Sequence, residues 1–227
     1  MATICVFCAS SESIDPCWIE LAGQVGSELA ARGHNLVSGG GAISAMGALA
    51  RAARAGGAHT IGVIPQALVD REVADHDADE LLVTLDMRTR KAAMDSRADG
   101  FLILPGGLGT LEELLEIWVA RGLGMHDRPV VVLDPGGLFA PLREQVKLLV
   151  AQRFMHQATA DLLSWTESVG DAFDALEAAA SGGQRLREFG GGRLAGGGEH
   201  EPVVAPEPED RAEDHADHVR GDVVGER

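Results

Sequence analysis

Two glycine-rich stretches are the segments of this sequence best suited to chemistry. The first is Ser38-Gly-Gly-Gly41 followed by Ala42-Ile-Ser-Ala-Met-Gly47, and the second is Pro105-Gly-Gly-Leu-Gly-Thr110-Leu-Glu-Glu113. Each follows a short apolar run and opens a helical pattern. Because glycine has no side chain, backbone N–H groups and the positive end of a helix can approach an anion closely there. These two glycine loops therefore predict a site for a phosphate-bearing ligand.

Neither loop fits the two most familiar nucleotide-binding motifs. A G-x-G-x-x-G fingerprint that starts at Gly39 would need glycine where Ser44 stands, and no acidic residue follows about 20 residues later, which argues against NAD or FAD. A P-loop needs a Gly-Lys pair, whereas neither of the two lysines, Lys91 and Lys147, follows a glycine. The sequence excludes P-loop ATPase chemistry, and we expect no cofactor.

Short apolar runs alternate with helical stretches along residues 1–181, and this alternation predicts the elements that position both loops. Strands are expected at 3–8, 35–38, 60–64, 81–84, 100–104, 129–133 and 162–165, and helices at 17–32, 44–55, 87–98, 110–123, 138–152 and 168–180. The pattern is typical of a parallel sheet with helices on both faces, whose ligands bind at the carboxyl ends of the strands. We predict a single α/β domain with a doubly wound, Rossmann-like parallel sheet.

Composition sets the last 46 residues apart from this domain. Residues 182–227 contain ten glycines, three prolines, 6 basic and 11 acidic residues, without apolar periodicity. Such a segment buries too little apolar surface to offset the entropy of ordering it. We predict a domain over 1–181 and a disordered, acidic, Gly/Pro-rich tail over 182–227.

Charge and residue usage exclude several functional classes. The chain has 35 acidic and 19 basic residues and a formal net charge of -16, which argues against a nucleic-acid polymer as partner because phosphate chains are bound by clustered Lys and Arg. No apolar run approaches the ~18 residues of a membrane helix, and no signal-peptide pattern is present, so we expect a cytoplasmic protein without a membrane partner. Cys5 and Cys8 are assigned to a buried strand rather than to redox chemistry.

The histidines do not suggest a metal centre. The eight histidines form no H-x-x-x-H or Cys/His cluster, so we expect no metal site. His126 and Asp127 are assigned to a loop that ends a helix, where a cation near the negative end of the helix dipole is favourable.

Thr110 and Glu113 also have a simpler interpretation as a capping box, in which each side chain satisfies an N–H group at the start of a helix. The preceding Pro105-Gly-Gly-Leu-Gly contains more glycine than a cap needs. Arg90 and Lys91 could likewise form surface ion pairs with acids four residues away on their own helix. From the residues alone, structural and functional interpretations of these side chains both remain open.

Three motifs in this order resemble those of the LOG (Lonely Guy) family, the cytokinin riboside 5′-monophosphate phosphoribohydrolases. They are the first glycine loop, Met87-Arg-Thr-Arg-Lys91 and Pro105-Gly-Gly-Leu-Gly-Thr110-Leu-Glu-Glu113. The resemblance covers about residues 3–180. It implies a Rossmann-like fold, a homodimer without metal, and hydrolysis of an N6-substituted or plain AMP to free base and ribose 5-phosphate.

The resemblance also implies roles for particular residues. The catalytic arginine of the family falls on Arg90 and its glutamate on Glu113. The expected substrate-binding residues are Glu72, Met87, Lys91, Gly106, Gly107, Gly109 and Thr110, with Gly40 and Gly41 of the first glycine loop. The phosphate is expected on the turn 106–110, with the ribose beside Glu113. Glu113 would then activate a water and screen the cation that develops at C1′, and Arg90 would hold substrate oxygens and keep Glu113 ionised.

Three features bear on oligomeric state and substrate preference. The helix at 110–123 is apolar nearly all round, which predicts that it is buried in a homodimer interface near the site. Ser44-Ala-Met-Gly47 stands where many relatives have Gly-Leu-Met-Gly, so we expect a slightly stiffer loop. Val119 stands where relatives carry Thr, which removes a hydroxyl near the expected base or sugar site.

Two other functions stay open at this point. A non-catalytic nucleotide or molybdenum-cofactor carrier would need the glycine loops but not an ionised carboxylate beside C1′. A lysine decarboxylase, a label often given to proteins of this family, would need a lysine to form a Schiff base with pyridoxal phosphate. The candidates for that role are Lys91 and Lys147.

Overall fold

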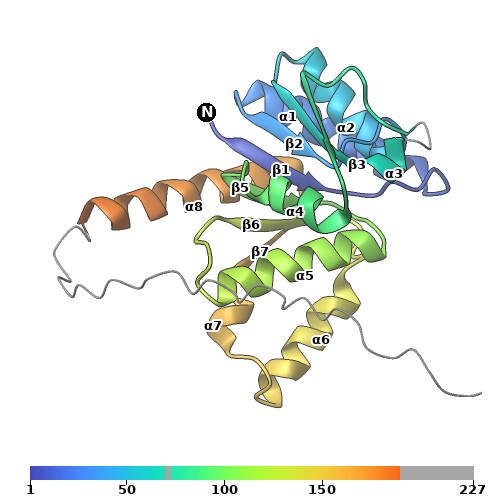
Figure 1. Ribbon diagram of the computed structural model, residues 1–227. Coiled ribbons are helices and arrows are strands. Elements are labelled where there is room, and N and C mark those ends of the chain that lie inside the picture. Colours follow the sequence, from blue (N-terminus) through green and yellow to red (C-terminus); the bar gives the residue numbers. More distant parts are fainter. Residues whose placement is uncertain (70–72, 190–227) are drawn as a thin grey trace, which may run out of the picture. The chain divides into compact units, whose positions relative to one another are not determined.

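A parallel sheet of seven strands runs through the part of the chain that the computed structural model describes, residues 1–69 and 73–189 (Figure 1). The strand order is β4-β3-β2-β1-β5-β6-β7, and every pairing between strands is parallel. The strands are β1 (Thr3–Phe7), β2 (Asn35–Ser38), β3 (Thr60–Pro65), β4 (Glu80–Thr84), β5 (Gly100–Ile103), β6 (Val130–Leu133) and β7 (Leu163–Thr166). Because the chain order reverses between β1 and β5, their carboxyl ends border the crevice in which such sheets bind ligands.

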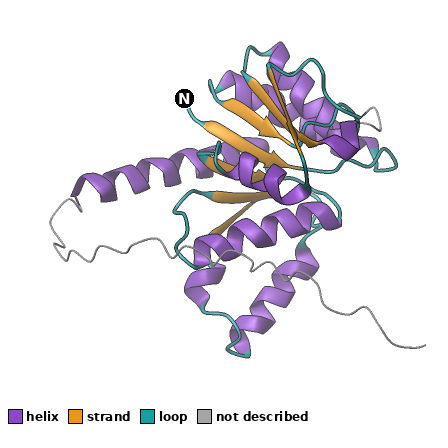
Figure 2. Cartoon of the chain, in the orientation of Figure 1, coloured by secondary structure: helices purple, strands orange, loops and turns teal. Residues whose placement is uncertain are grey.

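Helices cover both faces of the sheet (Figure 2). They are α1 (Pro16–Ala31), α2 (Ser44–Ala55), α3 (Gln66–Val69), α4 (Met87–Asp95), α5 (Leu108–Gly122), α6 (Ala140–Ala151), α7 (Gln157–Ala160) and α8 (Val169–Phe189). Apolar residues of α1, α2 and α8 form one core layer against the sheet, and those of α4 and α5 form the other, with α6 packed beside it. The predicted doubly wound α/β fold is confirmed.

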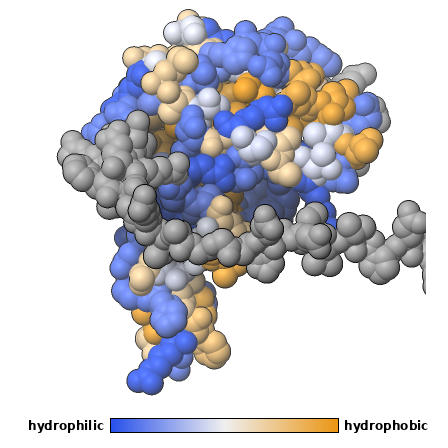
Figure 3. Space-filling view, turned by 60° about the vertical axis from the view of Figure 1, so that its left-hand side comes forward, coloured by the Kyte–Doolittle hydropathy of each residue, from blue (hydrophilic) through white to orange (hydrophobic). Residues whose placement is uncertain are grey.

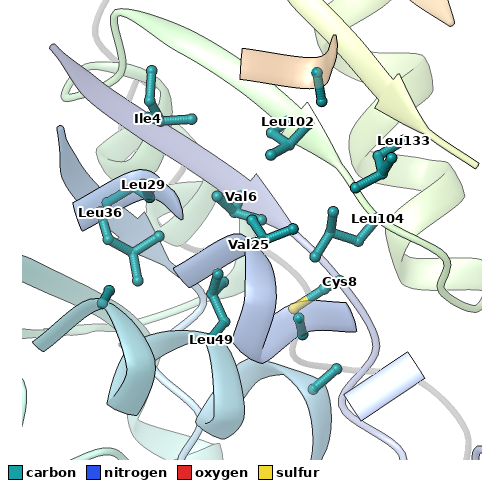
Figure 4. Packing of buried hydrophobic residues seen from close by; sticks show 14 of the residues in the cluster. Ile4, Val6, Cys8, Val25, Leu29, Leu36, Leu49, Leu102, Leu104 and Leu133 are labelled. Atoms are coloured by element: carbon teal, nitrogen blue, oxygen red, sulfur yellow. The ribbon is translucent and has the colours of Figure 1, made fainter. Parts of the chain in front are cut away.

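Alternate residues of β1, together with Cys8 directly after it, enter the two core layers. Ile4, Val6 and Cys8 pack toward α1 and α2 (Figure 4), whereas Cys5 and Phe7 pack toward α4 and α5. This alternation follows from the period of two residues in a strand, and both faces are apolar because both are covered. Cys5 and Cys8 are buried, free thiols on opposite faces of the sheet, as the packing interpretation predicts.

Ser44 begins α2 in a strained conformation that fixes the loop after β1. Its φ of 52° lies in the left-handed region, which costs about 1–2 kcal/mol for a residue with a side chain. Its hydroxyl donates a hydrogen bond of 2.5 Å to the carbonyl of Ser11. Ser44 therefore links the first glycine loop to the loop between β1 and α1.

Most element boundaries lie within one or two residues of the predicted ones, and the larger differences concern four helices. The predicted helix 87–98 ends at Asp95, because Ala98 donates to the carbonyl of Asp95 in a turn and the carboxylate of Asp99 accepts a hydrogen bond from the N–H of Thr3. Helix α5 begins two residues earlier than predicted, and the short helices α3 and α7 were not predicted. Helix α8 continues to Phe189, eight residues past the predicted end of the domain. Residues 190–227 of the predicted tail lie outside the described residues.

The surface is largely hydrophilic, as the number of charged residues in the sequence leads one to expect. Hydrophilic residues predominate on the face shown in Figure 3, and apolar residues gather in separate patches between them. Among the described residues, no helix has the length and apolar character needed to cross a membrane. All described residues fall in one compact unit, which contains both glycine loops.

Candidate active site

A pocket of about 730 Å³ opens at the carboxyl ends of β1, β2, β3 and β5. Its lining includes both glycine loops, the loop after β1, and side chains from α3 and α4. Most of the lining is apolar, with contributions from Ile14, Trp18, Met46, Val73 and Leu138. Two charged side chains that line it are themselves almost completely buried, Arg90 with 6% of its surface exposed and Glu113 with 8%.

Arg90 and Glu113 form an ion pair in this pocket. Arg90 extends from α4, and its Nη1 donates a hydrogen bond of 3.0 Å to Oε1 of Glu113 on α5. Its Nε donates a second bond of 2.9 Å to the carbonyl of Val63 near the end of β3. The guanidinium is therefore held by a strand and by a neighbouring helix at the same time.

Gly39 provides the space that the guanidinium of Arg90 occupies. A Cβ atom built on Gly39 would lie 2.0 Å from Nη2 of Arg90 and 3.1 Å from the sulfur of Met46. Real Cβ atoms do not approach other heavy atoms so closely, so any larger residue at position 39 would displace Arg90. The first glycine loop therefore makes room for the guanidinium of Arg90 and also lines the pocket.

The environment of Glu113 affects its protonation in two opposite directions. Burial raises the pKa of the Glu113 carboxyl above its usual value, because a charge is disfavoured in an apolar environment. The charge of Arg90 and its hydrogen bond lower the same pKa and partly offset the effect of burial. The balance leaves Glu113 with a raised pKa, which brings this carboxyl closer to the range suited to accepting a proton from water.

Cys8, which follows β1, also lines the pocket, but its thiol is not in a reactive form. Burial raises the pKa of the Cys8 thiol to about 12, and the negative charge of Glu113 acts in the same direction. A thiol with that pKa is neutral near pH 7, and the thiolate is the reactive form. Cys8 therefore serves as a wall of the pocket rather than as a nucleophile.

The second glycine loop leads into α5 with its N–H groups open to the pocket. Gly107 is the N-cap residue, and among the described residues no side chain caps the helix. Built Cβ atoms on Gly107 and Gly109 meet no described atom within 4 Å, whereas one on Gly106 would lie 2.2 Å from Oγ1 of Thr110. The start of α5 can therefore accept an anion, since its unpaired N–H groups and its dipole both favour negative charge.

The capping-box interpretation of Thr110 and Glu113 is wrong. Because α5 begins at Leu108, Thr110 is its third residue rather than its cap, and Glu113 lies in the second turn. The carboxylate of Glu113 accepts its hydrogen bond from Arg90, a residue of another helix. The structural alternative for this motif is thereby removed.

The alternative surface pairs of Arg90 with Asp86 and of Lys91 with Asp95 are also absent from the described contacts. Asp86 caps α4 instead, since its carboxylate accepts a hydrogen bond of 2.8 Å from the N–H of Thr89. Asp95 pairs with Arg128 at 2.6 Å. Lys91 reaches across to α5, where it pairs with Glu112 and, at 2.6 Å, with Glu116.

The structure brings most of the expected site residues to one pocket. Those that line it are Gly41, Met87, Arg90, Gly106, Gly107, Gly109, Thr110 and Glu113. Gly40 and Lys91 are not among the described lining residues, and Glu72 lies outside the described residues. Gly40 instead shapes the loop, with a φ of 73° and a carbonyl that accepts the N–H of Asp75.

Val119 and His126 lie away from this centre. Val119 is 57% exposed on α5 and is not among the described residues of the pocket, so a hydroxyl at this position would not face the ligand within one chain. Nε2 of His126 donates to the carbonyl of Ile117 within α5, and burial lowers the pKa of the imidazole. The neutral ring fits the predicted helix-ending loop, although not the cation expected there. Among the described residues, no group of three potential ligands could hold a metal ion.

The sequence did not single out the apolar wall of the pocket. Trp18 of α1, Val73 and Leu138 come from three segments that are far apart in the chain and have no common motif. Gly39 was part of the first glycine loop, but its contact with Arg90 depends on a partner 51 positions away, which no local pattern reveals.

Comparison with known proteins adds independent information. A protein-family model described as "possible lysine decarboxylase" matches residues 46–176. The chain is 50% identical over 173 residues to a cytokinin riboside 5′-monophosphate phosphoribohydrolase of Mycobacterium marinum, and the match covers 76% of this chain and 92% of that relative. A protein of the same name from Mycobacterium tuberculosis is 48% identical over 173 residues, with the same coverage.

A likeness to solved structures concerns the fold. The Moco carrier protein of Chlamydomonas reinhardtii matches with a TM-score of 0.60 at 20% sequence identity, over 80% of this chain and 98% of that chain. At this level of identity the match establishes a shared fold and nothing about the ligand.

Replacement of Arg90 by Met should raise the pKa of Glu113 further, because the cation that opposes the effect of burial is removed. A carboxyl whose pKa is raised by folding costs stability as pH rises through its folded-state pKa. Arg90→Met should therefore lose stability with rising pH more steeply than wild type. An NMR titration of ¹³C-labelled glutamate side chains, with Glu113→Gln to assign the signal, measures the shift directly.

The matched control for this titration is Arg88→Met. Arg88 lies on the same helix, is exposed, and changes the net charge by the same amount. It should leave the pKa of Glu113 close to that of wild type. An unchanged or lowered pKa in Arg90→Met would contradict the electrostatic description of the pair.

Proposed function

The chain belongs to the LOG family of cytokinin riboside 5′-monophosphate phosphoribohydrolases, and from this premise we propose that it hydrolyses the N-glycosidic bond of adenosine 5′-monophosphates. The products are the free base and ribose 5-phosphate, and the substrates are AMP and its N6-substituted forms, such as cytokinin riboside 5′-monophosphates. The observation that carries the proposal is the buried Arg90–Glu113 pair beside two glycine loops. The cytoplasmic location expected from the sequence remains a prediction.

The substrate phosphate is assigned to the start of α5. Gly107 and Gly109 leave the N–H groups of the first turn accessible from the pocket. An anion bound there gains from both the unpaired donors and the helix dipole. Such a local site explains how a protein with a net charge of -16 binds a phosphate ester, since the donors belong to the backbone.

From that position the ribose lies beside Glu113, one turn further along α5. Hydrolysis joins the oxygen of a water to C1′ and breaks the bond between C1′ and the base nitrogen. The nitrogen keeps the electron pair of that bond and takes up a proton to give the free base. A cation develops at C1′ in the transition state. The carboxylate of Glu113 stabilises this cation and accepts a proton from the attacking water, a role favoured by its raised pKa.

Arg90 favours the ionised form of the Glu113 carboxylate and orients the substrate. A guanidinium has five N–H groups, so its contacts with Val63 and Glu113 leave donors for substrate oxygens. Its charge favours the ionised form of Glu113, which is the form able to accept a proton. The apolar walls of the pocket strengthen both interactions because they exclude bulk water.

The two alternative functions have less support. Likeness to the Moco carrier protein is confined to the fold, and a carrier would not need a buried carboxylate with a raised pKa beside its anion site. For lysine decarboxylation, Lys91 is held between Glu112 and Glu116, and Lys147 is exposed beside Glu144. Neither lysine is among the described residues that line the pocket.

Glu113→Gln and Arg90→Ala should each abolish release of free base from AMP and from N6-isopentenyl-AMP. Loss of a general base typically lowers the rate by about 10²–10⁴-fold. The neighbouring substitution Glu112→Gln is the matched control, because that carboxylate is exposed and pairs with Lys91 on the outside of α5. Chromatographic separation of base and nucleotide measures the rates. A wild-type rate in Glu113→Gln would refute the assignment.

We also propose a homodimer that forms through one side of α5. Within one chain, four apolar residues spaced along this helix are substantially exposed: Leu108 (83%), Leu115 (43%), Val119 (57%) and Leu123 (68%). Such a stripe is typical of a helix that packs against another chain. Leu108 also lines the pocket, so a second copy on this stripe would adjoin the mouth of the site.

Light scattering at micromolar concentration should give the mass of a dimer, and the double substitution Leu115→Glu/Val119→Glu should give that of a monomer, because two charges would be buried in the interface. Val83→Glu is the control, since Val83 is 49% exposed on the edge strand β4, away from α5. A wild-type protein with the mass of one chain would contradict the dimer.

A further inference from the structure

We propose that Arg54 and Asp75 are a positioning pair that fixes one wall of the substrate pocket and thereby sets the affinity for the nucleotide. The inference rests on the proposed function, because it concerns the same pocket. Neither residue is among the described residues that line the pocket. Their effect is exerted through a short segment, residues 73–75, which the pair holds against the first glycine loop.

The pair has the geometry of a strong, directional contact. Nη1 of Arg54, at the end of α2, lies 2.7 Å from Oδ2 of Asp75, and Nη2 lies 3.1 Å from Oδ1. The two parallel bonds match the planar fork of the guanidinium to both carboxylate oxygens. The Arg54 side chain is 18% exposed and that of Asp75 is 7% exposed, so water competes little for either group.

Asp75 belongs to segment 73–75, which is joined to the first glycine loop by backbone hydrogen bonds. The N–H of Ala42 donates to the carbonyl of Val73 over 2.8 Å, and the N–H of Asp75 donates to the carbonyl of Gly40 over 2.8 Å. Between these bonds, Gly41 and Ala74 form an antiparallel bridge. The ion pair therefore holds two short segments together, and each segment contributes a residue to the pocket. These residues are Val73 and Gly41.

The position of the Arg90–Glu113 pair is fixed by other contacts. Arg90 is held by the carbonyl of Val63 and by Glu113, neither of which depends on segment 73–75. Loss of the Arg54–Asp75 contact would leave a buried charge without its partner, and the segment would move to reach water. The wall at Val73 would then loosen while the Arg90–Glu113 pair stays in place. The expected signature is a higher KM with little change in kcat.

Steady-state release of base from AMP by Arg54→Lys, Arg54→Met and Asp75→Asn tests this inference, together with the melting temperature of each protein. Arg54→Met and Asp75→Asn should raise KM about tenfold or more and keep kcat within about threefold of wild type. Arg54→Lys keeps the charge but loses the fork, so its KM should lie between those of wild type and Arg54→Met. If Arg54→Met fails to fold, the conservative Arg54→Lys still carries the comparison.

The matched control is Arg32→Met. The Arg32 side chain is 22% exposed and forms ion pairs of 2.7 Å with Glu28 and with Asp174. Arg32 caps the C-terminal end of α1, whereas the residue of α1 that lines the pocket, Trp18, lies in the first turn of that helix. This substitution should lower the melting temperature without altering KM. If the variants of Arg54 and Asp75 behave in the same way, the pair is only structural and the inference is overturned.

Failure of the proposed function gives a different result. A wild-type protein that releases no base from AMP or N6-isopentenyl-AMP refutes hydrolysis. The dissociation constant for AMP, measured by calorimetry, then replaces KM, and the same tenfold weakening in Arg54→Met supports the positioning role. A wild-type protein that neither hydrolyses nor binds AMP overturns both proposals.

Discussion

The buried contact between Arg90 and Glu113 is the interaction on which the rest of the site depends. A guanidinium and a carboxylate can share an apolar pocket only when each satisfies the other, and Arg90 has a further acceptor in the carbonyl of Val63. The sheet makes this possible, because parallel strands bring the ends of β2, β3 and β5 to one edge. Gly39 then supplies the space for the guanidinium at the end of β2. The glycine loops, the strand order and the ion pair are parts of one arrangement.

The groups that favour an anion lie in the pocket, although the chain as a whole is strongly negative. The whole chain carries a formal charge of -16, yet its pocket joins backbone N–H groups at the start of α5 to one buried arginine. Burial raises the pKa of Glu113, and the arginine limits that rise. The two effects together fit the proposed role of Glu113, a carboxylate that can be ionised and that is more basic than a free glutamate. A family of hydrolases that acts on nucleotide monomers can in this way work within a protein of high net negative charge.

The fold could be predicted from the sequence because apolar runs such as Val130–Leu133 and the intervening helical patterns each specify an element locally. The site could be predicted only in part. Thr110 and Glu113 fit a capping box by spacing, but Glu113 is engaged by Arg90, a tertiary partner that local spacing cannot reveal. Lys91 lies next to Arg90 in the chain and yet points to the outside of α5. The wall built by segment 73–75 has no motif, since an arginine 21 positions earlier holds it in place.

The measurement that tests the central claim most directly is the rate of base release from AMP by Gly39→Ala. This substitution keeps both members of the ion pair, and its closest clash, at 2.0 Å, is with Nη2 of Arg90. A displacement of about 1 Å in a catalytic group costs about 100-fold in rate, so Gly39→Ala should lose activity to that extent. Gly23→Ala, on α1 where an added Cβ meets no described atom within 4 Å, should keep the wild-type rate. Wild-type activity in Gly39→Ala would show that catalysis does not need Arg90 in the position described.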